Sequence, residues 1–487
     1  MRKEENKSCG WASSEFEEVE LGDQRLRKRL VQLADSLARF PESPINQACN
    51  GWAEAKAAYR FFQNEKVNEK DILASHVEQT LKRSKKQTVL LAIQDTSYFS
   101  YTSHRQTTGL GVISRTPGKN VKVMSSMGLV MHTSFAISTN GLPLGILDQN
   151  VFARQPQSEE LKAKKKKTHN VNVAIEDKES KRWLDSWRRT QETVRDTDIK
   201  VVTVCDREGD FYEFIELVVC HPDASLLVRA RGDRIINKSS RYSEKKDEKL
   251  WSYMLALPSQ GMIEVEIPAK DQKPARTAVL ETRFGSFTMN PPRNHIRHQT
   301  EDLPDIKLYA VYVVEKDPPK NVEALEWMLV TNLSVTNFDE AVEKVRWYCL
   351  RWRIEVFHKV LKSGLHVEQC RLQTADRLIR YLTVMSIIAW RIYWITLIAR
   401  TNPELPCTRL LEEDEWKVLY SKINKTRVYP QEPPKMREIV RWIAMLGGFL
   451  GRKGDGEPGV ITLWRGWKRL FDLSEGWILA HGLSTCG

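Results

Sequence analysis

Two aspartates stand at the ends of apolar, strand-like runs. Asp95 closes the run TVLLAIQD, and Asp206 closes DIKVVTVCD. Mg²⁺ prefers oxygen ligands, and a few carboxylates can hold it while other positions stay open for phosphate and water. A sheet that brings both aspartates to one edge would therefore suit metal-dependent phosphate chemistry. For either aspartate taken alone, a turn residue or a helix cap is the simpler interpretation.

A third acid, Glu355, lies in a segment whose pattern predicts one long helix from near Asp339 through Gly364. Six side chains recur there at helical spacing and, at about 100 degrees per residue, share one face. They are Tyr348, Arg351, Trp352, Glu355, Lys359 and Lys362. Cations around one carboxylate suit contact with a phosphodiester backbone, with Glu355 as a metal ligand. The alternative is intrahelical pairing of Glu355 with Lys359.

The composition fits a folded protein with a polyanionic partner. The chain has 487 residues, of which 41% are hydrophobic and 28% charged, and this excludes a disordered tail protein. Its formal net charge of +12 favours nucleic acid over a membrane surface. No apolar block follows the start MRKEENK, so we expect no secretory signal and a cytoplasmic location. The eight cysteines contain no C-x-x-C pair, and we expect buried thiols rather than disulfides or structural zinc.

The elements that must position the three acids follow one another along the chain. Residues 1–70 predict short helices, and the basic cluster from Arg25 to Arg29 either contacts a polyanion or forms a solvated helix face. Strand-like and helical runs follow from residue 88, with a hairpin turn at Asn140-Gly141. Residues 234–325 resemble a β-rich insert, and the chain beyond residue 375 predicts helices.

One apolar stretch raises a membrane-spanning alternative. Residues 381–399 are long and apolar enough to be considered as a spanning helix. Arg391 lies at the middle of the stretch, and a charge at that depth is costly in lipid. We therefore expect a buried helix of a folded protein.

The spacing of four residues resembles a known signature. Tyr348, Arg351, Glu355 and Lys362 form the pattern Y-x-x-R-x-x-x-E-x-x-x-x-x-x-K, which resembles that of the DDE transposases of bacterial insertion sequences. The subgroup it resembles excises its element by cut and paste through DNA hairpin ends. Further blocks resemble the same family in the same order: GDQRLRKRL, QDTSY, DKESKRW, CDREGDFYEF, LRWRIEVFHK and LGGFLGRKGDGEPGVITLWRGW. Several blocks in order are more specific than any one motif.

The resemblance implies a fold and a division into domains. It implies an α/β fold in which residues 71–375 form a ribonuclease-H-like catalytic domain, with the β-rich insert at about 234–325. Asp95 would lie on the first strand of that domain, Asp206 after the fourth, and Glu355 on a late helix. Residues 1–70 would be a helical domain that binds the terminal inverted repeats, and residues 376–487 a helical dimerisation domain.

The resemblance also implies a chemistry and a set of DNA contacts. Asp95, Asp206 and Glu355 would be the catalytic residues and would bind two Mg²⁺ ions, for which Mn²⁺ can substitute. The enzyme would cut the element's end, form and open a hairpin, and join the 3′-hydroxyl to target DNA, as a homodimer in the synaptic complex. The DNA contacts implied are Tyr348, Arg351, Lys362, Lys359, Arg229, Trp327, Arg25 and Arg29. For Trp327, a buried tryptophan of the core is an equal alternative to stacking on a displaced base.

Two other functions stay open from the sequence. A related metal-dependent nuclease would need the same carboxylates but would cut without joining. A DNA-binding protein without activity, such as a decayed copy or an inhibitor, could keep the same domains. The presence of all three acids argues against decay. Each of these proteins would act on double-stranded DNA in the cytoplasm, associated with the nucleoid.

Overall fold

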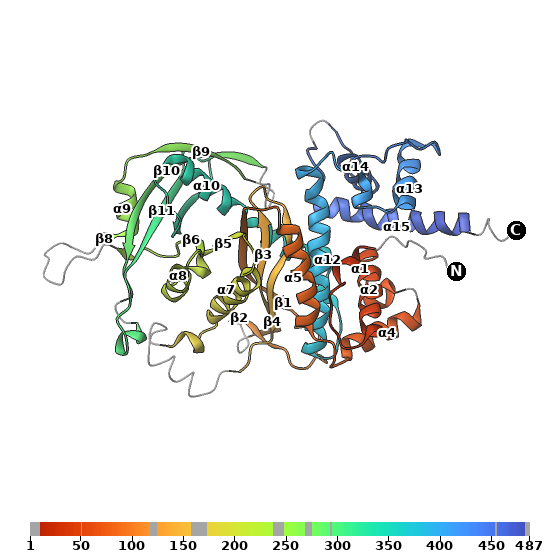
Figure 1. Cartoon of the computed structure of the whole chain (residues 1–487), viewed down its shortest axis with the longest axis horizontal. Helices are drawn as coiled ribbons and strands as arrows, with labels where there is room; N and C mark the ends of the chain where they lie inside the picture. Colours follow the sequence, from red (N-terminus) through yellow and green to blue (C-terminus); the bar gives the residue numbers. More distant parts are fainter. Residues whose placement is uncertain are drawn as a thin grey trace.

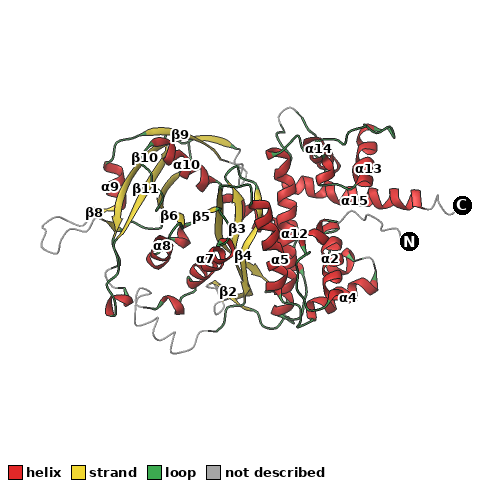
Figure 2. Ribbon diagram, in the orientation of Figure 1, coloured by secondary structure: helices red, strands yellow, loops and turns green. Residues whose placement is uncertain are grey.

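The computed structural model describes residues 10–49, 51–116, 124–156, 173–236, 248–267, 275–292, 295–452 and 455–482. Twelve strands of this described chain form one sheet in the order β2-β3-β1-β5-β6-β12-β11-β10-β7-β8, with β4 paired to β3 and β9 to β10. The strands gather in one half of the molecule, and the other half is helical (Figure 2). The fold is therefore mixed α/β, as the sequence predicts.

The middle of the sheet is formed by strands that are long or mostly buried. They are β1 (Val89–Ser100), β3 (Met124–Ser138), β5 (Lys200–Cys205) and β6 (Ser225–Arg229). β5 pairs parallel with both β1 and β6, whereas β3 pairs antiparallel with β1. Beyond β3 lie β2 (Gly111–Thr116) and β4 (Pro143–Phe152). The predicted hairpin is confirmed, since β3 and β4 are antiparallel and Gly141 at the turn has a φ of 88°.

The stretch between residues 234 and 331 extends the same sheet. Its strands are β7 (Ile235–Ile236), β8 (Glu248–Lys249), β9 (Gly261–Ile267), β10 (Arg276–Met289), β11 (Ile306–Glu315) and β12 (Glu326–Thr331). β12 pairs antiparallel with β6, where Leu329 lies opposite Arg229. The β-rich stretch is thus hydrogen-bonded to the central strands rather than packed beside them.

Each face of the sheet has its own apolar core, because successive side chains of a strand point to opposite faces. Leu91 and Ile93 of β1 belong to a core shared with the N-terminal helices and with α10 (Phe338–Cys349), α11 (Trp352–Lys359) and α12 (Ala375–Thr401). Leu226 and Val228 of β6 face a second core under α7 (Lys181–Val194), α8 (Tyr212–Val219) and α9 (Leu250–Ala256). Helices therefore cover both faces of the sheet (Figure 1).

The N-terminal helices pack against α12 and not as a separate core. They are α1 (Trp11–Glu15), α2 (Gln24–Arg39), α3 (Ile45–Ala48) and α4 (Trp52–Gln63), followed by α5 (Glu69–Ser84), which lies on β4. α12 runs between the sheet and α2 (Figure 1). Within the described part of the chain, α12 is the one helix long and apolar enough to cross a membrane, and most of it is buried. The expected buried helix at residues 381–399 is confirmed.

The C-terminal helices complete the helical half of the molecule. They are α13 (Glu413–Asn424), α14 (Met436–Leu446) and α15 (Val460–Gly482). Their apolar core includes Ile395 and Ile398 from the end of α12. One helix therefore contributes both to the core beneath the sheet and to the core of the C-terminal helices.

Three expectations from the sequence are corrected. The prediction of a single long helix near Glu355 is wrong, because α10 ends at Cys349 and α11 begins at Trp352. At the junction the backbone bonds span three residues, as from Leu350 N to Trp347 O, and the chain continues beyond α11 as a π-helical turn, Val360–Gly364. Asp206 follows the fifth strand rather than the fourth, because the short strand β2 precedes it. Cys220 is exposed, whereas Cys49, Cys205 and Cys407 are buried free thiols.

Candidate active site

Parallel pairing brings Asp95 and Asp206 to one edge of the sheet. Gln94 of β1 lies opposite Cys205, the last residue of β5, and an aspartate follows each of these two residues in the chain. Asp206 caps a short 3₁₀ turn, Arg207–Gly209, and its Oδ1 accepts a hydrogen bond from Glu208 N over 2.8 Å. This cap is the local role that an aspartate after a strand commonly has. It leaves the other carboxylate oxygen for a ligand.

Glu355 approaches the same edge from α11, which packs on β1. Burial raises the pKa of Asp206, and the nearby charges of Asp95 and Glu355 raise it further. The hydrogen bond from Glu208 N and the charge of Arg351 act in the opposite direction. His358, three residues after Glu355 on α11, contacts Asp95 directly. The three acids predicted from the sequence therefore converge on one region of the molecule.

Two of the acids are paired with basic side chains of α11 and its N-terminus. Arg351 Nη2 donates to Glu355 Oε1 over 2.5 Å, and His358 Nδ1 lies 3.4 Å from Asp95 Oδ2. Among the described residues, no three His, Cys, Asp or Glu side chains meet closely enough to hold a metal ion. The carboxylates are near neighbours, but they do not point at one common centre in this arrangement.

Tyr348, Arg229 and Trp327 lie together beside the acids. Tyr348 is 2% exposed, and its ring packs edge-to-face on Trp327 of β12 with the centroids 5.1 Å apart. Arg229, at the end of β6, donates from Nη2 to Glu326 O over 2.9 Å. Burial lowers the pKa of Arg229, and the neighbouring Tyr348 opposes the change while Arg351 adds to it. The structure therefore brings Arg229, Tyr348 and Arg351 into one group.

The two lysines of this region differ in their surroundings. Lys362 lies over the ring of Phe99 at 5.2 Å from its centroid. Burial lowers the pKa of Lys362, while Glu368 and Asp95 act in the opposite direction. Lys362 is therefore close to the acids, whereas Lys359 is exposed on α11.

Sequence reasoning missed a polar cluster on the other face of β1. Thr96 Oγ1 lies 2.9 Å from His132 Nδ1 and accepts from Arg182 Nε over 3.0 Å, and Arg182 Nη2 also donates to Glu208 Oε2. Burial lowers the pKa of His132 far below its usual value, so the ring is neutral. Beside this cluster lies an open groove of about 570 Å³, lined by Ser180, Arg182, Trp183, Arg207, Glu208 and Arg231. The sequence blocks DKESKRW and CDREGDFYEF contain most of these residues, and they were the one feature of the sequence from which the cluster could have been predicted.

The N-terminal candidates lie elsewhere in the molecule. Arg25 is at the start of α2, its side chain is 91% exposed, and its Nη2 is 3.1 Å from Asp23 Oδ2. Arg29 lies one turn further along the same helix and is half-buried. Figure 1 shows α2 on the opposite side of α12 from the sheet. Within a single chain, the helix that carries these arginines is therefore separated from the three acids. Trp52, on neighbouring α4, is 79% exposed and was not singled out from the sequence.

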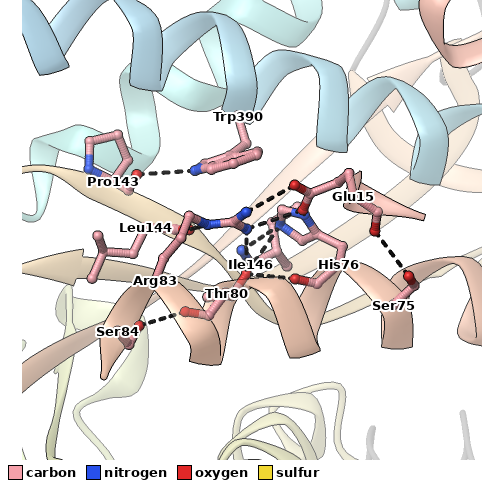
Figure 3. A network of polar contacts seen from close by, with 10 residues as sticks. All are labelled: Glu15, Ser75, His76, Thr80, Arg83, Ser84, Pro143, Leu144, Ile146 and Trp390. Atoms are coloured by element: carbon pink, nitrogen blue, oxygen red, sulfur yellow. Dashed lines mark hydrogen bonds and ion pairs between the residues drawn. The ribbon is translucent and has the colours of Figure 1, made fainter. Parts of the chain in front are cut away.

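A buried polar network connects the N-terminal helices to the sheet and to α12 (Figure 3). Glu15 accepts hydrogen bonds from Arg83 and lies against His76 Nδ1, while His76 Nε2 accepts from Ile146 N over 2.9 Å. Since Nε2 is an acceptor, His76 is the neutral tautomer with its proton on Nδ1. Burial also lowers the pKa of His76. The guanidinium of Arg83 lies 4.0 Å from the ring centroid of Trp390 on α12.

Comparison with known protein families adds two matches, at opposite ends of the chain. Residues 8–67 match the family model described as transposase DNA-binding. This range covers α1 to α4 and both N-terminal arginines. Residues 387–487 match the family model described as the Tn5 transposase dimerisation domain, which begins within α12. Together the matches support a transposase that binds DNA and dimerises, and in particular one of the Tn5 type.

Proposed function

We propose that the chain is a DDE transposase that binds the terminal inverted repeats of its insertion sequence and moves it by cut and paste. The observation that carries the proposal is geometric: Asp95 and Asp206 occupy neighbouring positions on paired strands, and α11, which bears Glu355, contacts Asp95 through His358. This acidic group lies between a region that matches a DNA-binding family and one that matches a dimerisation family. A DNA-processing reaction at the acids accounts for all three features.

The strand order supports a ribonuclease-H-like catalytic core. The order β4-β3-β1-β5-β6, in which only β3 runs against the others, puts β1 and β5 side by side. Adjacent parallel strands deliver their carboxyl ends to the same edge of the sheet, where ligands bind in such folds. Glu355 reaches that edge from a helix that follows the sheet in sequence.

The donor chemistry of the acids fits Mg²⁺, with Mn²⁺ as a substitute. Asp95, Asp206 and Glu355 supply carboxylate oxygens, which are hard ligands, and their mutual repulsion is relieved by a cation. When bound, two such ions would activate the attacking oxygen and stabilise the leaving oxygen. The ion pair between Arg351 and Glu355 must open for both oxygens of Glu355 to take part as ligands.

Basic and aromatic side chains around the acids are proposed to hold the DNA. Arg351, Arg229 and Lys362 suit the phosphate beside the scissile bond, and Tyr348 can donate its hydroxyl proton to a phosphate oxygen. Lys359 extends the basic surface along α11. Arg25 and Arg29 bind the terminal repeat through α2, and a second protomer completes the complex. The protein then acts where the DNA is, in the cytoplasm at the nucleoid.

The proposed reaction sequence has four steps of phosphoryl transfer. Water cleaves one strand and leaves a 3′-hydroxyl at the element's end. This hydroxyl attacks the opposite strand, which forms a hairpin and releases the flanking DNA. A second water opens the hairpin, and the regained 3′-hydroxyl attacks target DNA. A base displaced at the hairpin would stack on Trp327, which must leave its contact with Tyr348 to reach it.

The proposal is tested with labelled end DNA and Mg²⁺ on a denaturing gel. We expect wild-type protein to give hairpin-ended DNA and Glu355→Gln to lower the cleavage rate by roughly a thousandfold or more, since a catalytic group is removed. Glu343→Gln on α10 is the matched control, because the Glu343 side chain is 49% exposed and pairs with Lys344. Equal cleavage by wild type and Glu355→Gln would falsify the catalytic assignment. Cut products without joining to a target plasmid would indicate the nuclease instead.

A further inference from the structure

Arg351 and Glu355 form a part-buried ion pair at the junction between α10 and α11. Arg351 Nη2 donates to Glu355 Oε1 over 2.5 Å. The Arg351 side chain is only 8% exposed, whereas that of Glu355 is 38% exposed. The Arg351 guanidinium is thus held within the protein, whereas the Glu355 carboxylate has room to rotate.

The guanidinium of Arg351 has donors to spare. It lies 5.8 Å from the ring centroid of Tyr348 and 5.1 Å from that of Trp352, so aromatic rings hold it in place. Its Nε is buried and has no hydrogen-bond partner among the described residues. A guanidinium carries five N–H donors, and a buried donor without an acceptor costs free energy. An acceptor that reached both Nε and an Nη atom would remove this cost.

Arg351 also supplies positive charge where the three acids gather. Its charge acts on both Asp206 and Asp95, as well as on Glu355. While Glu355 Oε1 is bonded to Arg351, that oxygen is not available to a metal ion.

A DNA phosphate can compete with Glu355 for this guanidinium. The Nε and Nη2 N–H groups of an arginine are parallel and suit a bidentate phosphate, so a phosphate that bound both would compete with Glu355 for Nη2. We propose that Arg351 is a positioning residue, which holds Glu355 away from the metal site in the DNA-free protein and releases it when a DNA phosphate takes its place. This inference deepens the proposed function and rests on it.

The exchange links two binding events. Both oxygens of Glu355 become free for a metal ion only after Arg351 has turned to phosphate, so end DNA strengthens metal binding. By thermodynamic linkage, the metal must strengthen binding of end DNA by the same factor. The protein thereby avoids a fully assembled metal site when no DNA is present.

Metal binding to the DNA-free, full-length protein tests the proposal. Mn²⁺ is titrated, and its midpoint concentration is read from the rise in melting temperature. We expect Arg351→Gln to lower this midpoint about tenfold relative to wild type, and Arg351→Lys, which keeps a charge but loses the planar fork, to lower it less. Arg353→Gln is the matched control, because Arg353 Nη1 lies 3.4 Å from the Tyr393 hydroxyl rather than at Glu355. Its midpoint should equal that of wild type.

Two further measurements complete the test. Adding Glu355→Gln to Arg351→Gln should abolish the gain, and end DNA added to wild type should lower the Mn²⁺ midpoint about tenfold. Because the wild-type measurement needs no variant, it stands even where Arg351→Gln does not fold. An unchanged midpoint with DNA, or in a folded Arg351→Gln protein, overturns the proposal even if Glu355→Gln abolishes cleavage and the transposase assignment stands. Full cleavage by Glu355→Gln overturns both.

Discussion

Trp327 shows how burial bears on a proposed role at the scale of one residue. It is 5% exposed on β12 and packs on the ring of Tyr348. The amino-acid sequence left two interpretations open, a core tryptophan and a residue that stacks on a displaced base. Both can hold if Trp327 is buried before DNA binds and leaves its pocket when it stacks on the base. That movement would also free Tyr348, which lies beside the proposed phosphate contacts.

We expect two substitutions of Trp327 to separate packing from base stacking. Trp327→Ala should lower the free energy of unfolding by about 3–5 kcal/mol, because it removes a large buried side chain. Trp327→Phe should keep the fold yet form hairpins severalfold more slowly than it makes the first cut, because the smaller ring stacks less on a base. Urea unfolding and the ratio of hairpin to nicked DNA measure the two effects. An unchanged ratio for Trp327→Phe would assign Trp327 to the core alone.

The candidate site was readable from sequence where chemistry follows residue type and strand ends. Asp95 and Asp206 could be placed at one sheet edge because both close apolar strands. The contact of Thr96 with His132 could not be predicted from the sequence, because it depends on the cross-strand register that sets these two residues opposite each other. Arg182 joins them from α7, a helix whose rotation about its axis is fixed by packing. Such long-range geometry has no local signal in the sequence.

At the scale of elements, the junction between α10 and α11 is the clearest departure from the sequence pattern. Apolar spacing continues across Leu350, and a single three-residue turn is right-handed like the α-helix and too short to change the apolar pattern visibly. Periodicity therefore does not detect it. The strand regions were predicted more completely, since short apolar runs and the turn at Asn140-Gly141 are local signals. The order of the twelve strands in the sheet was not predicted, because strand pairing joins segments that lie far apart in the chain.

A close approach of β4 to α5 gives a prediction at this scale. Gly145 of β4 has a φ of 154°, and a Cβ atom built there would lie 1.9 Å from Thr80 Oγ1. We expect Gly145→Ala to lower the free energy of unfolding by about 1–3 kcal/mol or more, because the strand and helix must move apart. Gly476→Ala is the control, since Gly476 is exposed in α15 with open space around it. Equal melting temperatures for the two variants would contradict the expectation.

At the scale of the whole molecule, the three parts predicted as separate domains share one apolar core. It runs from Ala12 through Leu91 of β1 to Trp464 of α15. The network of Figure 3 lies inside this core and ties α1 to α5, β4 and α12. Burial opposes ionisation of Glu15, but His76 and Arg83 lower its pKa to about 2. The N-terminal helices are thereby fixed to the sheet by a buried charge.

This buried charge should make stability depend on pH. The folded pKa of Glu15 lies below its ordinary value of 4.5, so its contribution is complete above pH 4.5 and is lost as the pH falls towards 2. The difference corresponds to about 3 kcal/mol of unfolding free energy. We expect Glu15→Gln to be less stable at pH 6 and to lose less stability between pH 5 and pH 3, as measured by urea unfolding. The exposed Glu17→Gln should follow the wild-type curve.

α12 carries a constraint that loops do not. Its 27 residues form a single unbroken rod from Ala375 to Thr401, with the sheet against one part and the C-terminal helices against its end. One inserted or deleted residue would turn everything downstream by about 100 degrees and shift it by about 1.5 Å. The length of α12 therefore sets the orientation of the C-terminal helices with respect to the sheet. Changes in chain length that keep both halves aligned must fall in the loops on either side of it.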